Sequence, residues 1–553
     1  MSPSRSLVVV VCVLSAEHLH AQGVPNDLPA RIDAVFARFT ANTPGCAVGL
    51  AKDGKTLHTR GYGMANLEYG VPLTDQTVLE SGSVAKQFTA SALVLLAQDG
   101  KLSLDDEIRK YLPEVPDFGK TITIRHLLTH TSGLRDQWGL LGIEGRGPGS
   151  QVHSALTTLD LVVHQKMLNF PPGSRYLYSN TGYALAGLIV QRVSGKSLDA
   201  FTQERLFKPL GMTHTQWRDD FTEVVKGRAT AYDGTEAAGF RTDMPFTNMI
   251  GNGGLLSTIA DLLKWNENLD SPKVGGQAYV DALQTRMRLT NGRTIRYALG
   301  LEFGDLFGVK QIGHGGSTAG YRTYLARYPE QRVSVAVWCN YAGANPAMLS
   351  AQVVNLVLTK PADVAGQAIS AKVETSIENL RRAAGLYRDA YTDQALSLVA
   401  EPSQLAIAGG GGRGGGRAGF LPQGWPRFSG PLGEAVFDIT TAPRTFMLVR
   451  PDGDTSRFEE VRAAPTTIPA QDYIGTYTSD ELDVRLEVVV RNGGLVVRRR
   501  PAEELELRPV YVDDFQAAGL GTIRFARDAS GKVTGLAIYA GRVLDVRFKR
   551  LAR

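Results

Sequence analysis

A serine and a lysine stand three residues apart in the stretch SGSVAKQFTA, where Ser83 and Lys86 come just before a run of helical character. If Ser83 opens a helix, both side chains point to one side of it, one turn apart. A serine hydroxyl is a weak nucleophile at neutral pH, so a base must take its proton during attack on a carbonyl. Lys86 can serve if burial and neighbouring cations lower its pKa. The pair therefore predicts acyl transfer, although Ser-x-x-Lys also occurs by chance.

Two other stretches carry groups that such a reaction needs. Tyr178 and Asn180 form a Tyr-x-Asn in YLYSNTGYALAG, directly before a helical run. A His-Gly-Gly at 314–316 closes one expected strand, and a hairpin-like turn then begins another. Alone, YSN is an ordinary turn and His314 an ordinary core histidine. Together with the Ser-x-x-Lys pair, they predict one catalytic site.

These motifs resemble those of the class C β-lactamase and low-molecular-weight penicillin-binding-protein superfamily of serine hydrolases, and more narrowly its D-aminopeptidase and esterase-like branch. TITIRHLLTHTSGL and GGLLSTIADLLKW agree with that superfamily, and the resemblance covers nearly all of residues 47–340. It implies an α/β (α+β) β-lactamase-like catalytic domain, with an antiparallel sheet flanked by helices and a helical subdomain. It implies no cofactor and no metal ion. The chain has no counterpart of the acidic deacylation loop of class A β-lactamases.

The resemblance also implies a role for each residue of the three motifs. Ser83 is the expected nucleophile, and the division of base and relay between Lys86 and Tyr178 stays open. Asn180 is expected to orient Lys86 and the amide group of the substrate. The oxyanion is expected to bind the backbone N–H groups of Ser83 and Ser317.

The third motif departs from the pattern of most β-lactamases in this superfamily, which carry Lys-Thr-Gly where this chain has His314. Gly315 and Gly316 lack a Cβ and let the strand backbone lie close against a substrate. Histidine with a pKa of about 6.5 is mostly neutral at pH 7, so it attracts a carboxylate less than lysine does. Histidine at this place resembles D-aminopeptidases and related amidases and esterases. Arg322, on the following strand, is the next candidate for setting carboxylate preference.

His126 and His130 stand four residues apart on an expected helix, which is the spacing of a zinc-binding pair. No glutamate lies between them as metal-dependent hydrolases need. We expect a structural segment instead, with Thr123 as helix N-cap and Gly133 ending the helix.

The chain of 553 residues is too long for a single hydrophobic core. After residue 360 the sequence changes to alternating apolar and polar segments, and matches around Tyr387 and Tyr477 repeat at an offset of about ninety residues, which predicts two small antiparallel β-barrels of lipocalin-like type. The expected boundaries are a signal peptide at 1–21, the hydrolase domain at 27–360, a linker at 361–379, and barrels at 380–464 and 470–553.

A glycine-rich run at 408–419, AGGGGRGGGRAG, is placed between the first two strands of the first barrel. It has no side chains with which to build a core, so we expect a mobile loop, and one that reaches over the catalytic cleft is a further hypothesis.

The N-terminus has the pattern of a secretory signal peptide, with Arg5 ahead of the apolar run at 7–14. The run is too short for a permanent membrane anchor, so we expect a periplasmic or secreted protein. Cys46 and Cys339 then remain, each in a strand-like run. We expect two small buried hydrophobic residues, with a disulfide as the alternative.

The formal net charge of +5 is slight for this length and argues against a nucleic-acid partner. The expected partner is a small-molecule or peptide substrate, and the oligomeric state is left open. The leading hypothesis is an acyl-serine amide hydrolase of β-lactams or D-amino-acid peptides. The alternatives are a carboxylesterase with the same residues and a penicillin-binding sensor that acylates without turnover.

Overall fold

A six-stranded antiparallel sheet forms the centre of the N-terminal half of the computed structural model, which describes residues 26–360, 375–411, 417–465 and 467–552. The expected signal peptide and most of the expected linker lie outside these residues. In spatial order the strands are β10 (Glu302–Leu306), β11 (Val309–Thr318), β12 (Tyr321–Tyr328), β13 (Val333–Cys339), β1 (Cys46–Lys52) and β2 (Lys55–Tyr62).

Helices cover both faces of this sheet because its central strands are apolar on both sides. The strand β13 reads VSVAVWC and is buried throughout, as expected for a strand between two layers of helices. Cys46, Val48 and Leu50 pack with α1 (Leu28–Phe36) and α11 (Pro346–Val354). The alternate residues face α9 (Ile259–Asp270), where Gly49 leaves room for Ile259.

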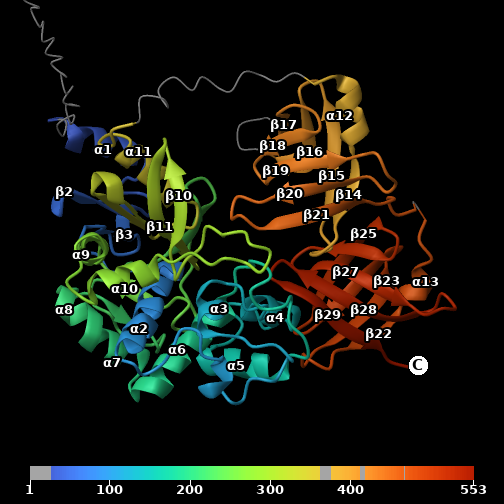
Figure 1. Ribbon diagram of the computed structural model, residues 1–553, viewed down its shortest axis with the longest axis horizontal. Helices are drawn as coiled ribbons and strands as arrows, with labels where there is room; N and C mark the ends of the chain where they lie inside the picture. The colour runs from blue at the N-terminus through green and yellow to red at the C-terminus, as the bar shows by residue number, and fades with distance from the viewer. Residues whose placement is uncertain (1–25, 361–374, 412–416, 466, 553) are drawn as a thin grey trace, which may run out of the picture.

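A helical subdomain lies beside the sheet, with α2 (Lys86–Gln98) and α6 (Asn180–Ser194) at its centre (Figure 1). Almost every residue of these two helices is buried except at their C-terminal ends. The other helices here are α3 (Ile124–Leu128), α4 (Gln137–Ile143), α5 (Ala155–His164), α7 (Leu198–Thr202), α8 (Lys208–Leu210) and α10 (Gly276–Leu283). Short strands connect them: β3 (Met64–Asn66), β4 (Val71–Pro72), β5 (Leu79–Glu80), β6 (Gln216–Trp217), β7 (Tyr232–Thr235), β8 (Gly239–Thr242) and β9 (Leu255–Ser257).

The helix expected at His126 and His130 is shorter than its sequence suggested. Thr123 caps α3 as predicted, because its side chain accepts a hydrogen bond from the backbone N–H of His126. The helix ends at Leu128, however, and His130 has a left-handed backbone with φ of 58°. The prediction that Gly133 ends this helix was therefore wrong.

Cys46 and Cys339 form a disulfide between directly opposed positions of β1 and β13. Both residues are fully buried. The expectation of two separate buried hydrophobic residues was wrong, because the strand register places the two cysteines face to face.

Two closed barrels of eight antiparallel strands follow, each with its strands in sequence order. The first contains β14 (Gly385–Asp389), β15 (Ala395–Glu401), β16 (Gln404–Gly411), β17 (Arg417–Pro422), β18 (Arg427–Gly430), β19 (Gly433–Asp438), β20 (Thr445–Val449) and β21 (Thr455–Glu460). The second contains β22 (Gly475–Thr478), β23 (Arg485–Arg491), β24 (Gly494–Arg499), β25 (Glu503–Tyr511), β26 (Asp514–Ala517), β27 (Gly521–Arg527), β28 (Val533–Ala540) and β29 (Val543–Arg550).

The predicted repeat is visible in matching contacts at the start of each barrel. A short helix precedes the first strand in both, α12 (Ile377–Ala383) and α13 (Ala470–Tyr473). The hydroxyl of Tyr387 donates to the carbonyl of Ala383 at 2.9 Å, and that of Tyr477 donates to the carbonyl of Tyr473 at 2.7 Å. The two prominent tyrosines of the repeat thus close the same turn in both copies.

The glycine-rich run is not between the first two strands. Its first part belongs to the end of β16 and its last part to the start of β17, the third and fourth strands of the barrel. Glycine does not prevent strand pairing, because backbone N–H and C=O groups make the hydrogen bonds between strands. Much of the run is therefore strand and not loop. Residues 412–416, on which the hypothesis of a loop over the cleft rests, lie outside the described residues.

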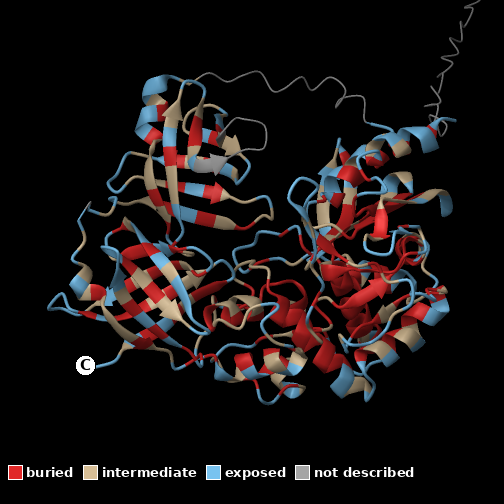
Figure 2. Ribbon diagram, turned by 180° about the vertical axis from the view of Figure 1, so that it is seen from behind, coloured by how far each residue is buried: buried red, intermediate tan, exposed pale blue. Residues whose placement is uncertain are grey.

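The second barrel packs directly on the helical subdomain (Figure 1). Leu140, Leu141 and Ile143 of α4 and Leu161 of α5 belong to the same buried cluster as the barrel core. Figure 2 shows this continuity as buried residues that run from the subdomain into the barrel. Within the part of the chain that the structure describes, no helix is both long and apolar enough to cross a bilayer.

Candidate active site

Ser83 lies in a single 3₁₀ turn (Gly82–Ala85) that leads into α2, and Lys86 is the first residue of that helix. The two side chains therefore lie one turn apart, as predicted. Gly82 has a φ of 51°, and a Cβ there would lie 2.5 Å from the backbone nitrogen of Ser317. Only glycine fits, so the turn presses Ser83 against β11.

The amine of Lys86 makes three hydrogen bonds in a fully buried position. Its Nζ lies 3.0 Å from Oγ of Ser83, 2.8 Å from Oδ1 of Asn180 and 2.7 Å from the backbone oxygen of Asn252. The two oxygens of Asn180 and Asn252 belong to carbonyl groups and can only accept. A neutral amine would give them its two hydrogens and turn its lone pair toward the Ser83 hydroxyl.

Burial lowers the pKa of Lys86 well below its ordinary value, and the positive charge of Arg542 lowers it further. Asp136 and Glu302 act in the opposite direction. A depressed pKa makes the neutral amine accessible nearer to neutral pH, which is the state in which lysine can act as a base.

Tyr178 packs against this amine through its ring, whose centroid is 4.9 Å from Nζ of Lys86. The imidazole ring of His130 also packs against the phenol ring of Tyr178, with ring centroids 4.0 Å apart. The hydroxyl is buried and has no hydrogen-bond partner among the described residues. Burial raises the pKa of Tyr178 above its ordinary value, against smaller lowering effects of Ser83 and Arg542. The phenol is therefore protonated at neutral pH and available as a donor.

Asn180 opens α6 and positions Lys86 through its side-chain oxygen. Its side-chain nitrogen donates to Oδ2 of Asp136 at 3.0 Å, and its backbone nitrogen donates to the same atom at 2.7 Å. One N–H of the amide is left for a substrate, because the side chain has two.

His314 is buried, with both ring nitrogens in contact with protein atoms. Nδ1 lies 2.5 Å from the backbone oxygen of Gly315, and Nε2 lies 2.9 Å from the hydroxyl of Tyr297. The carbonyl can only accept, so Nδ1 carries the proton and Nε2 accepts from Tyr297. Burial lowers the pKa of His314, while Glu302 at 3.9 Å raises it. The ring is therefore neutral at pH 7 and does not offer a charged donor to a carboxylate.

Gly316 and Ser317 bring β11 alongside Ser83. A Cβ on Gly316 would lie 2.1 Å from the backbone oxygen of Ser81. The hydroxyl of Thr323 donates to that same oxygen at 2.8 Å and fixes the contact. The turn that carries Ser83 thus packs directly against the backbone of β11 at Gly316 and Ser317.

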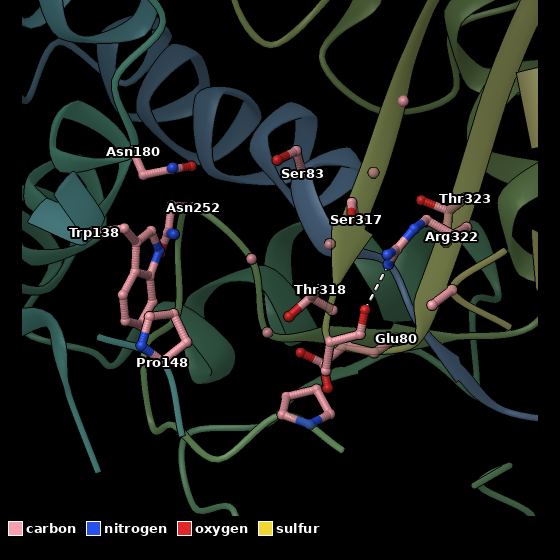
Figure 3. A pocket seen from close by; sticks show the side chains of 18 of the residues that line it. Glu80, Ser83, Trp138, Pro148, Asn180, Asn252, Ser317, Thr318, Arg322 and Thr323 are labelled. Carbon is pink, nitrogen blue, oxygen red and sulfur yellow. Dashed lines mark hydrogen bonds between the residues drawn. The ribbon is translucent and has the colours of Figure 1, made fainter. Parts of the chain in front are cut away.

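A cleft of about 1060 Å³ opens over these groups. Figure 3 shows Asn180 and Trp138 on one wall and Ser317 and Thr318 on the other, with Ser83 between them. Among the residues that the structure describes, no group of three or more potential ligands could hold a metal ion. Nδ1 of His126 accepts a hydrogen bond from the backbone N–H of Thr123, and Nδ1 of His130 accepts one from the backbone N–H of Ser179.

A family model described as Beta-lactamase matches residues 32–360, which include Ser83, Lys86, Tyr178, Asn180, His314 and Ser317. The chain belongs to the Beta-lactamase family. It is 26% identical to a D-aminopeptidase of Brucella anthropi over 530 residues, which cover 92% of this chain and 95% of that protein.

Two solved structures share the fold. An octameric penicillin-binding protein homologue from Pyrococcus abyssi has 22% identity and a TM-score of 0.54, and covers 86% of this chain and 99% of its own. The D-amino acid amidase from Ochrobactrum anthropi has 23% identity and a TM-score of 0.51, and covers 60% of this chain and 98% of its own. The Beta-lactamase family membership and the fold make this chain a serine hydrolase.

Two residues beside this Beta-lactamase family site were missed from the sequence. Asp136 caps α4 and anchors Asn180, and the only sequence signal was its place before an apolar run. Arg542 comes from the turn between β28 and β29 of the second barrel and lines the cleft. Of the described lining residues, none belongs to the first barrel.

Proposed function

We propose that this serine hydrolase cleaves amide bonds of D-amino-acid derivatives through an acyl-enzyme on Ser83. The observation that carries the proposal is the buried amine of Lys86, which lies 3.0 Å from Oγ of Ser83 and has two carbonyl acceptors for its hydrogens. The choice of substrate is supported by the Brucella anthropi relative, which is named a D-aminopeptidase and aligns with nearly the whole chain.

In the first half of the reaction, Oγ of Ser83 attacks the amide carbonyl while its proton passes to Nζ of Lys86. The tetrahedral oxyanion accepts hydrogen bonds from the backbone N–H groups of Ser83 and Ser317. When the C–N bond breaks, the leaving nitrogen takes the proton of the Tyr178 hydroxyl, and Lys86 returns its proton to Tyr178. The acyl group stays on Ser83 and the amine departs.

In the second half of the reaction, a water molecule attacks the acyl carbon and gives one proton to Nζ of Lys86. The bond to Oγ of Ser83 breaks, Ser83 recovers its proton, and the carboxylic acid leaves. The raised pKa of Tyr178 argues against a phenolate base, and the lowered pKa of Lys86 supports its amine as the group that first accepts the proton.

We further propose that the protein is exported. The apolar N-terminal run supports this, and so does the Cys46–Cys339 disulfide, because disulfides persist mainly in oxidising compartments.

A panel of chromogenic substrates tests the proposed reaction. We expect kcat/KM for D-alanine 4-nitroanilide to exceed that for the L-enantiomer by at least about ten-fold, and a chromogenic cephalosporin to be a poor substrate. Equal rates for the two enantiomers would contradict the proposal. Turnover restricted to 4-nitrophenyl butyrate would instead identify a carboxylesterase.

A further inference from the structure

The turn that joins β28 to β29 carries Arg542 to the edge of the catalytic cleft. This turn is part of the second barrel, which sits against α4 (Figure 1). The chain therefore completes the wall of its cleft with a residue from a different domain.

Hydrogen bonds on both sides of the turn hold it in place. The backbone oxygen of Arg542 accepts from the side-chain nitrogen of Asn169 at 3.0 Å and from the backbone nitrogen of Asp136 at 3.4 Å. The side-chain oxygen of Asn169 accepts from the backbone nitrogen of Leu544 at 2.9 Å. Arg135 donates to the backbone oxygens of Leu544 and Asp545 at 3.0 Å each. These hydrogen bonds fix the backbone from which the side chain of Arg542 extends.

The side chain of Arg542 lies over the phenol ring of Tyr178, with its guanidinium carbon 4.5 Å from the ring centroid. It is 47% exposed, and its contact with Asp136 is long at 3.9 Å. Asp136 already accepts four hydrogen bonds, from the backbone of Trp138, Gly139 and Asn180 and from the side chain of Asn180. None of the described residues accepts a hydrogen bond from the guanidinium, so its donors are open to the cleft.

The other ionisable groups that line the cleft do not supply an equivalent cation. His314 is neutral at pH 7 and hydrogen-bonded at both nitrogens. Arg322 also lines the cleft, and one of its amino groups turns back to donate to the backbone oxygens of Ala319 and Tyr321. The carboxylates of Asp243 and Asp233 act on its charge, so Arg322 is partly compensated. Lys86 is enclosed beside the nucleophile.

The anions of the cleft do not neutralise Arg542 either. Glu80 is buried in ion pairs with Arg218 and Arg228. Glu302 is half-exposed, and its ionic contact is with His314. Asp243, the remaining anion among the described lining residues, acts on Arg322. The described part of the cleft therefore contains a fixed, accessible positive charge at Arg542.

We propose that Arg542 is a specificity-determining residue that binds a carboxylate on the leaving-group side of the substrate. A guanidinium with open donors matches a carboxylate in shape and charge. The leaving side follows from the contact with Tyr178, the proposed proton donor to the leaving amine, and in this respect the inference rests on the proposed function. The preferred substrates are then D-amino-acid peptides whose departing residue carries a free carboxylate.

Arg542→Gln tests this with two matched substrates, D-alanyl-glycine and D-alanyl-glycinamide, which differ in that carboxylate alone. The native enzyme should favour the acid by about ten-fold to a hundred-fold in kcat/KM, the range of a charged hydrogen bond. Arg542→Gln should bring the ratio close to one, mainly through KM. Arg542→Lys should keep part of the preference, because it retains the charge and loses the planar fork.

Arg547→Gln is the matched control, since Arg547 is an exposed residue of β29, the strand that follows the turn, and is paired with Asp545 and not among the described residues that line the cleft. It should leave the ratio unchanged. An unchanged ratio in Arg542→Gln, with both dipeptides cleaved, would overturn the role of Arg542 and leave the proposed function standing.

A pair of esters distinguishes failure of the proposed D-amino-acid function from failure of the proposed carboxylate site. 3-Acetoxybenzoate and 3-acetoxybenzamide share an acetyl group and differ in the charge of the departing phenol. If neither dipeptide is cleaved but Arg542→Gln lowers the preference for 3-acetoxybenzoate, the D-amino-acid function fails and the carboxylate site stands. If Arg542→Gln alters the acid-to-amide ratio of neither pair, the carboxylate site is refuted.

Discussion

Glu481→Gln should loosen the second barrel from the catalytic domain, because it removes one half of a buried ion pair. Arg135 of the catalytic domain is fully buried and Glu481 of the barrel is nearly so, and the two form a direct hydrogen-bonded ion pair. Removing one partner of a buried pair costs about 3 to 5 kcal/mol, because the remaining charge is left uncompensated.

The structure places the expected cost near the lower end of that range. The guanidinium of Arg135 would keep its bonds to the backbone oxygens of Leu544 and Asp545. We therefore expect a loss of about 3 kcal/mol, which lowers Tm by about 3 °C when the catalytic domain and the second barrel unfold as one unit. Because Leu544 and Asp545 follow Arg542, the acid-to-amide preference for D-alanyl-glycine should fall in parallel.

Thermal unfolding and kcat/KM for the two dipeptides measure these effects. The matched control is Glu506→Gln, the same change in a pair with Arg508 that is exposed on both sides. It should cost less than about 1 kcal/mol. If Glu481→Gln is no more destabilising than Glu506→Gln and keeps the substrate preference, the ion pair does not fix the barrel.

Three other predictions concern single side chains. Lys86→Ala should slow acylation by about 10² to 10⁴-fold in single-turnover assays, and full activity would remove Lys86 as the base. In the native enzyme, kcat/KM should rise with pH and level off well below pH 10.5, because burial depresses the pKa of Lys86; a rise that continues past that value would contradict this state of the amine. Burial, with a further contribution from Asp393, raises the pKa of Asp514 to about 8, so the folded protein keeps a proton that the unfolded chain releases above about pH 4. Stability should then fall between pH 4 and 8 by up to about 1.4 kcal/mol per pH unit, and Asp514→Asn should flatten this slope in urea titrations; an unchanged slope would show that the folded protein does not keep the proton on Asp514.

The residues that meet through local helix geometry were predictable from the sequence. Ser83 and Lys86 are one turn apart, and Asn180 opens a helix that its flanking residues already indicated. Family resemblance linked these segments, and the structure brings them to one cleft. The alternating pattern around Tyr387 and Tyr477 likewise predicted two barrels, because strand periodicity is a local property.

Features that depend on the packing of distant segments were not predictable. The disulfide follows from the register of β1 against β13. The sequence gives the residue type of His314 but not the hydroxyl of Tyr297 that fixes its tautomer. Arg542 reads as an ordinary hairpin residue, and its position over Tyr178 arises only when the second barrel docks on α4.

The identity of the acylated residue is the most direct test of the account. The enzyme is mixed with D-alanine 4-nitrophenyl ester, quenched in acid within the first turnover, digested and analysed by mass spectrometry. We expect a D-alanyl adduct on the peptide that contains Ser83, and no adduct and no hydrolysis in a folded Ser83→Ala variant. An adduct on another residue, or turnover that survives in Ser83→Ala, would contradict the assignment of Ser83 as the nucleophile.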